Sequence, residues 1–551
     1  MRRWLPHVLA LALLGSAGTG PVPAAEPEPL LLGEDDRLLV LAPHPDDETL
    51  AAGGLLQEAL GLDLPVRVCF FTMGDNDEIA FLFTRRHPVS TPGAERAQGT
   101  LRQNEAIAAA TQLGLGTNDL VFLGYPDAGT LDIWNHHWRT VPPYRSPLSR
   151  ASAVPYDRVF TPGSAHAGED ILDDLVEVIR DFRPTHVVLP HPADHNVDHR
   201  ALQLFARVAL WDAAPDVPPP LLLAAPVHLT RWPEPRRHLP QRSAAPPAFL
   251  EGDAWREFGL AAFQVANKLA ALRRHHSQFL HGAAYLQPFV RKSELFAVLP
   301  DLPFPGGVGA ARLAEPDATQ FRADPGLFAE LALESDRWRD IADQNAAETA
   351  DLGDLDNDFV AQDLAGDGLR LTLAFRFRKP VAPGAALVVS LFGHRADVPF
   401  GQMPKISIEV SPGQPAVVKD LGAKQPAETI ALLPGGAAGI ALAVPYALLG
   451  NPDRILVGAK LAKGRLPIDW TPWRVLDLTG ASRPSAPASG SFPAPPAPGA
   501  ELPPSAPAVP PAPPPPPAVA LPEPPPVLAP RVNLPRKPVP EKTEANEPVM
   551  W

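Results

Sequence analysis

The sequence predicts an α/β fold, in which a mostly parallel sheet with helices on both faces is followed by a β-rich domain and a proline-rich tail. From about residue 36 to residue 300, apolar strand-like runs alternate with helix-like segments, an order typical of parallel sheets. From about residue 329 the pattern changes to short alternating strands between glycine and proline turns. The chain has 551 residues, which is too long for one ordinary domain.

The N-terminus has the three parts of a secretory signal. Arg2-Arg3 is a basic region, residues 9–14 are apolar, and Val22-Pro23-Ala24 is a small-residue cleavage site. We therefore expect residues 1–25 to be a signal peptide, and the protein to be exported by a bacterium into the periplasm or the medium. The apolar stretch is too short to span a bilayer, and we expect no integral membrane span elsewhere.

The predicted elements of the first domain follow from apolar runs and from end signals. Carboxylates at positions 46–48 suit the positive end of a helix dipole, and Gly114 is a usual residue after a helix end. The expected strands are Arg37–Leu41, Val66–Thr72, Leu120–Leu123 and His186–Leu189, and the expected helices are Leu50–Leu60, Leu101–Leu113, Ile171–Phe182 and His199–Trp211.

A long polar segment, from Asp132 to about Ala167, interrupts this pattern. Insertions of this length are often functional lids or rims. Its rings could line a sugar-binding cleft or pack on the domain surface, and the sequence leaves both readings open. The residues concerned are Trp134, His136, His137, Trp138, Tyr144 and Tyr156.

The C-terminal half predicts a linker at 301–328, a β-sandwich at 329–480 and a tail at 481–551. Residues 369–377 alternate between apolar and polar side chains with a period of two, as half-buried strands do. The tail is rich in proline, alanine and serine and cannot build a core, so we expect it to be extended or disordered.

Charge and cysteine content limit the partners. The formal net charge of −14 disfavours nucleic acid and anionic membrane surfaces. The single cysteine, Cys69, excludes an internal disulfide, and its apolar surroundings predict a buried thiol. The sequence does not indicate the oligomeric state.

Two clusters of histidine and aspartate each follow an apolar run. Pro43-His44-Pro45-Asp46-Asp47-Glu48 comes after residues 38–42, and the segment His191–His199 comes after residues 185–190. Sites in parallel sheets lie beyond the carboxyl ends of the strands. Because histidine and carboxylate are metal ligands, the two clusters predict one metallohydrolase centre.

A catalytic zinc takes three protein ligands and leaves a position for water. We assign His44, Asp47 and His199 as these ligands, although iron or cobalt could use the same set. Asp46 is the expected general base, which accepts a proton from the attacking water and passes it to the leaving amine. Asp198 is expected to orient a neighbouring group of the site.

Five motifs together resemble the LmbE-like (PIG-L) zinc N-deacetylases over roughly residues 36–300. The resemblance implies a Rossmann-like fold and hydrolysis of an N-acetyl group, commonly on an N-acetylglucosamine unit. The motifs are Ala42-Pro43-His44-Pro45-Asp46-Asp47-Glu48, Leu101-Arg102-x-x-Glu105, Phe122-Leu123-x-x-Pro126-Asp127-x-Gly129, Asp198-His199-Arg200, and Lys268 with His275-His276-Ser277-Gln278.

The resemblance implies the same zinc ligands and base, and it makes Arg102 a substrate contact. One position departs from the family pattern His-x-Asp-His, whose first histidine stabilises the oxyanion. Asn196 stands there, with His195 one residue earlier. A lost oxyanion donor costs about 3 kcal/mol. Three alternatives therefore stay open: His195 moves in as a catalytic residue, Asn196 contacts the substrate in a weaker form of that role, or the mechanism relies more on Asp46.

These observations predict an exported zinc amidase that removes the N-acetyl group of an amino-sugar glycan or glycoconjugate. The β-sandwich would then bind or orient the polymer, and the tail would be a spacer. Two alternatives stay open. One is a non-catalytic glycan-binding or structural protein of the cell envelope on the same fold, and the other is a zinc amidase for a non-sugar N-acyl amide.

Overall fold

The computed structural model describes residues 26–76, 91–314 and 359–480. Short gaps within these ranges fall at 140, 230–231, 248–249, 251–252, 379, 423–424, 427–429, 431, 434, 436–437 and 464–465. The predicted signal peptide at 1–25 and the predicted tail at 481–551 lie outside the described residues.

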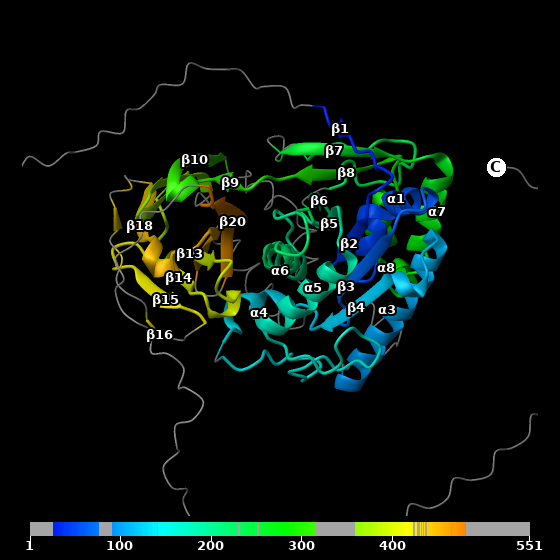
Figure 1. Cartoon of the computed structure of the whole chain (residues 1–551), viewed down its shortest axis with the longest axis horizontal. Coiled ribbons are helices and arrows are strands. Elements are labelled where there is room, and N and C mark those ends of the chain that lie inside the picture. Colours follow the sequence, from blue (N-terminus) through cyan, green and yellow to red (C-terminus); the bar gives the residue numbers. More distant parts are fainter. Residues whose placement is uncertain are drawn as a thin grey trace, which may run out of the picture. The chain divides into compact units, whose positions relative to one another are not determined.

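The N-terminal part is built on an eight-stranded sheet with the order β1-β7-β8-β6-β5-β2-β3-β4 (Figure 1). Strands β6, β5, β2, β3 and β4, the last of them at the edge of the sheet, are parallel, whereas β8 runs antiparallel to β6 and β7. The predicted α/β class with a mostly parallel sheet is confirmed. The strands are β1 (Glu28–Pro29), β2 (Leu38–Ala42), β3 (Val66–Thr72), β4 (Leu120–Tyr125), β5 (His186–Pro190), β6 (Leu221–Ala225), β7 (Ala254–Gly259) and β8 (Ser293–Val298).

Helices cover both faces of this sheet. Helices α1, α3 and α7 pack together, as do α4, α5 and α6, and the two groups lie on opposite sides of the strands in Figure 1. The helices are α1 (Asp47–Gly61), α3 (Pro92–Leu113), α4 (Thr130–His136), α5 (Gly168–Phe182), α6 (Val197–Ala213), α7 (Ala262–Leu272) and α8 (His276–Leu286). Short 3-10 turns are η1 (Thr117–Asp119), η3 (Gln287–Phe289), η4 (Pro305–Gly307), η5 (Phe400–Gln402) and η6 (Tyr446–Leu449).

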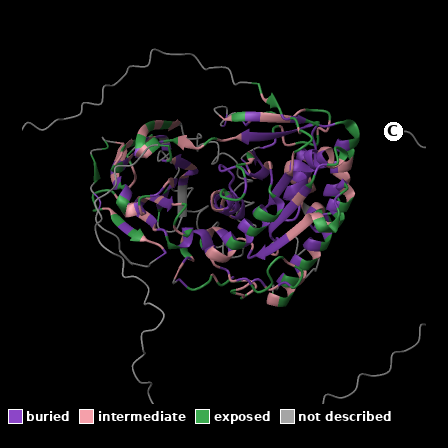
Figure 2. Cartoon of the chain, viewed as in Figure 1, coloured by how far each residue is buried: buried purple, intermediate pink, exposed green. Residues whose placement is uncertain are grey.

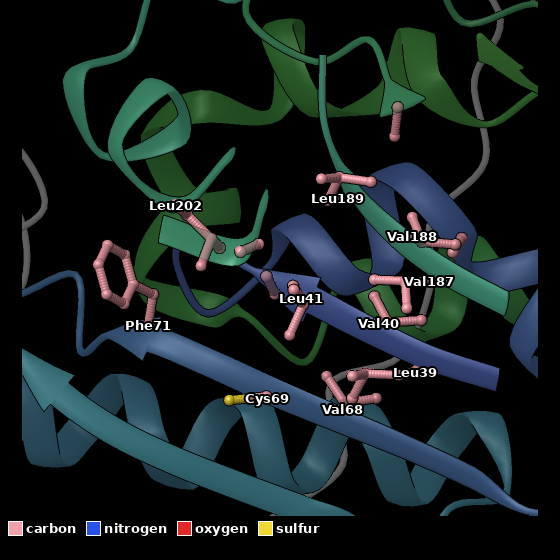
Figure 3. Close-up of a cluster of buried hydrophobic side chains, with 14 of the residues drawn as sticks. Leu39, Val40, Leu41, Val68, Cys69, Phe71, Val187, Val188, Leu189 and Leu202 are labelled. Carbon is pink, nitrogen blue, oxygen red and sulfur yellow. The ribbon is translucent and has the colours of Figure 1, made fainter. Parts of the chain in front are cut away.

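The central strands are buried because helices cover both of their faces (Figure 2). Every residue of β2 is buried, and its side chains pack against those of β3 and β5 (Figure 3). Cys69 lies in this core and is 1% exposed, as predicted. A rigid core of this kind fixes where the strands end, and the candidate site lies at those ends.

The C-terminal part consists of two further sheets, of five and seven strands, with the orders β10-β11-β12-β18-β17 and β16-β15-β14-β13-β19-β20-β9. Side chains of both sheets meet in one hydrophobic cluster, to which β12 contributes every second residue. The strands are β9 (Leu302–Pro303), β10 (Val308–Ala314), β11 (Phe359–Asp367), β12 (Arg370–Phe377), β13 (Ala385–His394), β14 (Lys405–Val410), β15 (Val417–Asp420), β16 (Gln425–Pro426), β17 (Leu432–Leu433), β18 (Gly439–Pro445), β19 (Arg454–Lys463) and β20 (Leu466–Asp477).

The predicted linker at 301–328 begins too early. β9 pairs with β20 and β10 pairs with β11, so residues up to Ala314 belong to the β-rich part. The sequence gives little sign of this because β9 is only two residues long and three of the seven residues of β10 are alanine. Residues 315–358 lie outside the described ranges.

The aromatic segment that could have lined a sugar cleft is largely a packing surface. Trp134 and Trp138 are 0% exposed. Trp134 stacks on Phe392 and Phe400, with ring centroids 5.5 Å apart in each pair, and meets Trp473 edge-on at 6.3 Å. Of the two readings that the sequence left open, packing is the one that holds for these two tryptophans, which join the α/β part to the β-rich part. Within the described ranges, no helix has the length and apolar character needed to cross a membrane.

Candidate metal centre

The candidate site lies at the carboxyl ends of β2, β4, β5 and β6. His44 follows β2, Asp127 follows β4, and Asp194 follows β5, while His199 lies in the first turn of α6. His228 comes soon after β6. The fold thus brings the two predicted His/Asp clusters together, as expected for strand ends at one edge of a parallel sheet.

His44, Asp47 and His199 form a group whose ligand atoms all lie within 4.8 Å of one another. Asp47 Oδ2 lies 3.1 Å from His44 Nδ1 and 3.0 Å from His199 Nε2. All three residues are buried, at 8%, 2% and 0% exposed. Two imidazoles and a carboxylate in this arrangement could hold a divalent metal ion.

The other nitrogen of each imidazole faces carboxylates. Asp194 Oδ2 lies 3.0 Å from His199 Nδ1. Asp127 Oδ1 and Asp198 Oδ2 each lie 3.3 Å from His44 Nε2. Metal-binding histidines commonly have such a carboxylate partner, which fixes the tautomer and strengthens the ligand.

Three buried polar atoms of the group make no hydrogen bond of good geometry among the described residues. They are Asp47 Oδ1, His199 Nδ1 and His199 Nε2, although each of the two imidazole nitrogens lies 3.0 Å from a carboxylate oxygen. Burial lowers the pKa of His199, but Asp194 and Asp47 outweigh burial and raise the pKa to about 10. A cation is therefore favoured between these carboxylates, and the residues fit a metal ion.

Asp46 is adjacent to the metal group and is not part of it. Burial, together with Asp47 and Glu48, raises its pKa to about 7, although Arg102 and His275 oppose the shift. A carboxylate with a pKa near neutrality is suited to accept and return a proton. Its backbone φ of 131° lies in a region that side chains other than glycine rarely adopt.

Arg102 organises the loops around Asp46. This buried residue of α3 donates to Gly74 O and Pro45 O, both at 2.8 Å, and its Nη2 lies 3.4 Å from Asp46 Oδ2. Gly74 has a φ of 60°, and a Cβ there would lie 2.2 Å from Arg102 Nη1, so only glycine fits. The substrate role predicted for Arg102 stays a prediction.

Glu48 and His275 also hold the loop that carries Asp46. Glu48 Oε2 accepts from the Asp46 backbone N–H at 2.9 Å. Glu48 Oε1 lies 3.0 Å from His275 Nε2 and also accepts from Thr49 Oγ1 at 2.5 Å. Glu48 and the distant residues Arg102 and His275 thereby fix the backbone that presents Asp46.

Asn196 and His195 have positions that bear on the oxyanion role predicted for one of them. Asn196 Oδ1 accepts from the backbone N–H groups of Asp198 at 2.8 Å and His199 at 3.4 Å, so Asn196 is the N-cap of α6. The ring of His195 meets Trp470 of β20 edge-on at 5.7 Å. Burial lowers the pKa of His195 to about 4. Neither residue belongs to the three-residue metal group.

Asp198 contacts both His44 and the loop after β4. Besides its contact with His44 Nε2, it accepts from Ala128 N at 2.8 Å and from the Thr130 hydroxyl. This geometry supports the predicted orienting role, which remains a prediction about function.

Sequence reasoning assigned no role to Asp127, Asp194 and His228. Asp127 and Asp194 lie within segments that were already singled out, so their spacing could have indicated them. His228 had no such signal because β6, the strand that positions it, is a short run that was not predicted.

Residues 39–210 match a protein-family model described as PIG-L: GlcNAc-PI de-N-acetylase. The PIG-L likeness is thereby confirmed for this segment. A curated relative, 1D-myo-inositol 2-acetamido-2-deoxy-alpha-D-glucopyranoside deacetylase 1 of Saccharopolyspora erythraea, is 31% identical over 173 residues, which are 30% of this chain and 48% of the relative. The chain thus spans about half the length of that relative.

Several solved structures also match part of this chain. A conserved protein of Thermus thermophilus is 22% identical, covers 48% of this chain and 96% of its own, and has a TM-score of 0.30. An inhibitor complex of N,N'-diacetylchitobiose deacetylase from Pyrococcus horikoshii is 16% identical, with coverages of 48% and 84% and a TM-score of 0.31. The A40926 pseudoaglycone deacetylase Dbv21 is 18% identical, with coverages of 48% and 96% and a TM-score of 0.30.

Proposed function

We propose that this protein is a zinc-dependent hydrolase that removes the acetyl group from the nitrogen of an amino sugar. The observation that carries the proposal is the buried group of His44, Asp47 and His199 with Asp46 beside it. The match of residues 39–210 to a de-N-acetylase family model supports the same reaction.

His44, Asp47 and His199 would hold the ion. When bound, zinc polarises an amide carbonyl and lowers the pKa of water. Asp46 takes one proton from the attacking water, whose oxygen forms a bond to the carbonyl carbon. The bond between that carbon and nitrogen then breaks, Asp46 returns the proton to the leaving amine, and acetate and a primary amine result.

Arg102 prepares Asp46 for this role through charge. Its guanidinium opposes the burial that raises the pKa of Asp46. Without this cation, the carboxyl group would hold its proton more tightly and would be a poorer acceptor at neutral pH. We propose that the same guanidinium also contacts the substrate, as the family resemblance implies.

An amino-sugar substrate is supported by two comparisons. The family model is described by its action on a GlcNAc unit, and the relative from Saccharopolyspora erythraea is named for an acetamido-glucopyranoside. The signal-like N-terminus supports export, so we propose a glycan or glycoconjugate outside the cytoplasm as the substrate. The β-rich part would orient it.

The test is the release of acetate and primary amine from N-acetylglucosamine oligomers by purified mature protein. We expect release that stops after chelation and returns when zinc is added. Asp46→Asn is the matched control, since it should keep the metal and lose turnover. A metal-loaded protein that releases no acetate from any acetylated sugar would contradict the proposal, and it would favour another N-acyl amide or a glycan-binding role.

A further inference from the structure

His228 lies against the candidate metal group, although it is far from both histidine clusters in the sequence. Its ring meets the ring of His199 edge-on, with centroids 4.6 Å apart and an interplanar angle of 82°. It is half-buried and comes from the loop after β6. The imidazole is therefore a neighbour of a metal ligand and has no assigned role.

The backbone of His228 is tied to the same network as His199. The His228 N–H donates to Asp194 Oδ2 at 3.0 Å, and this carboxylate oxygen also lies 3.0 Å from His199 Nδ1. The His228 carbonyl accepts from the backbone N–H of His195 at 3.1 Å. Movement of the loop after β6 relative to the metal group is thus restrained at two points.

The ring of His228 is held by Tyr285 of α8. The two rings stack with centroids 5.5 Å apart and an interplanar angle of 11°. Tyr285 Oη lies 2.9 Å from His228 Nδ1 and 3.3 Å from the Val227 carbonyl oxygen, so Nδ1 is the nearer of the two acceptors for the hydroxyl proton. When the tyrosine hydroxyl donates to Nδ1, the proton of a neutral imidazole is on Nε2, which becomes a donor.

The other ring nitrogen is the one available to a substrate. Among the described residues, Nε2 of His228 has no hydrogen-bond partner. Asn196, in contrast, uses its side-chain oxygen to cap α6, and the ring of His195 packs against Trp470. His228 is therefore an imidazole that lies against the metal group and has, among the described residues, one ring nitrogen without a hydrogen-bond partner.

We propose that His228 Nε2–H donates a hydrogen bond to the amide oxygen of the substrate as negative charge develops on it. The inference rests on the proposed amide hydrolysis and names a further residue for that reaction. His228 keeps its proton throughout, so the proton balance between water, Asp46 and the leaving amine is unchanged. Tyr285 is a positioning residue, since it acts only through the orientation of His228.

The kinetic test compares His228→Ala, His228→Gln and Tyr285→Phe with the wild type. For His228→Ala we expect kcat to fall about 100-fold or more, the size of effect seen for loss of an oxyanion donor, with KM changed only slightly. His228→Gln keeps an N–H donor and should recover part of kcat, and Tyr285→Phe should lie between wild type and His228→Ala. His238→Ala, which removes an exposed imidazole elsewhere on the chain, is the control and should change nothing.

Metal content and melting temperature separate this role from a structural one. All variants should retain the wild-type metal stoichiometry. Loss of metal from His228→Ala, or wild-type kcat in that variant, would overturn the inference. So would a variant His195→Ala that loses the 100-fold in kcat while His228→Ala does not.

Acetate binding supplies a readout that does not depend on turnover. Titration calorimetry of the zinc-loaded protein with acetate should show about tenfold weaker binding in His228→Ala than in wild type, because the carboxylate loses one donor. Equal acetate affinity in the two proteins would contradict the inference. If wild type releases no acetate from any amide, the proposed function fails, whereas this titration still decides whether His228 is a donor at the anion site.

Discussion

At the scale of single residues, the backbone of Asp46 is the most constrained feature of the site. Its φ of 131° is unusual for a residue other than glycine, and such conformations cost about 1–3 kcal/mol. The Glu48 carboxylate compensates by accepting the Asp46 N–H, and His275 holds that carboxylate in place. This conformation separates the two neighbouring aspartates, so that Asp47 joins the candidate metal group and Asp46, the proposed base, lies beside it.

Asp46→Asn tests this division between neighbours. The amide cannot take a proton, so we expect kcat to fall at least 100-fold, the usual contribution of a general base. Bound metal should stay at the wild-type level because His44, Asp47 and His199 are intact. A metal-free Asp46→Asn protein, or one with full activity, would remove Asp46 as the base.

His199→Ala should lose metal and activity together. The substitution removes one of three ligands and leaves the Asp194 and Asp47 carboxylates without their cationic partner. Metal analysis after dialysis against a weak chelator is the measurement. His136→Ala, which changes an exposed imidazole of α4, is the control; full metal retention in His199→Ala would contradict the assignment.

At the scale of elements, α6 both carries His199 and packs against Trp134 of α4. Its first turn carries His199 beneath the Asn196 cap, while Phe205, further along, packs against Trp134 with ring centroids 4.9 Å apart. The packing fixes the helix axis, and the cap fixes where the helix begins. Together they place the second histidine of the metal group.

Asn196→Ala should destabilise the protein by about 1 kcal/mol, since an N-cap side chain is lost. Asn196→Ser keeps a capping oxygen and should be close to wild type in stability. Denaturant unfolding of the two variants measures this difference. A large loss of kcat in Asn196→Ser at unchanged stability would instead show that the Asn196 amide acts on the substrate.

The sequence predicted the elements that are buried on both faces. β3 has the predicted bounds, and β2 and β5 are shifted by one residue at most. Continuous apolar runs of this length are typical of strands that are buried on both faces. Helix α3 begins at Pro92 rather than Leu101, since its first turns are polar and are defined by the Thr91 cap. Such local capping leaves little trace in an apolar pattern.

The aromatic segment shows a different limit of sequence reasoning. Periodicity within 132–167 says nothing about Phe392, Phe400 and Trp473, which cover Trp134 from more than 250 residues further along the chain. His228 is similar, since its role follows from a tertiary contact with His199. The metal group could be predicted from the sequence because its residues lie in two short segments, each next to a strand that was itself predicted.

At the scale of the whole described chain, the α/β part and the β-rich part share one core. Phe392, Phe400 and Trp473 belong to the same buried cluster as the strands of the parallel sheet. Polar contacts join the same surfaces, with Arg139 Nη2 2.5 Å from Asp420 Oδ1 and His394 Nε2 2.8 Å from Asp212 Oδ1. We therefore expect the β-rich part and the α/β part to fold together.

Phe400→Ala should therefore destabilise the whole protein in one cooperative transition. Truncation of a fully buried aromatic side chain costs about 3–5 kcal/mol. Calorimetry should show a single shifted transition and a parallel loss of the proposed deacetylase activity on heating. Two separate transitions, with only one of them shifted, would contradict the shared core.

Trp470 of β20 connects the β-rich part to the candidate site. Its ring lies 4.2 Å from the Arg200 guanidinium and meets the ring of His195. Both residues lie close to His199 in the sequence, so the β-rich part supports the loop that presents this proposed metal ligand. Trp470→Ala should lower kcat, and Trp470→Phe should restore most of it; unchanged kinetics in Trp470→Ala would separate the β-rich part from catalysis.

The central claim is that His44, Asp47 and His199 bind one metal ion beside Asp46. Diffraction from zinc-soaked crystals, measured on both sides of the zinc absorption edge, tests it most directly. We predict one strong anomalous peak in contact with these three side chains, and none in Asp47→Ala. A peak held instead by His44, Asp127 and Asp198, the other group within ligand distance, or no peak in the wild type, would contradict the account.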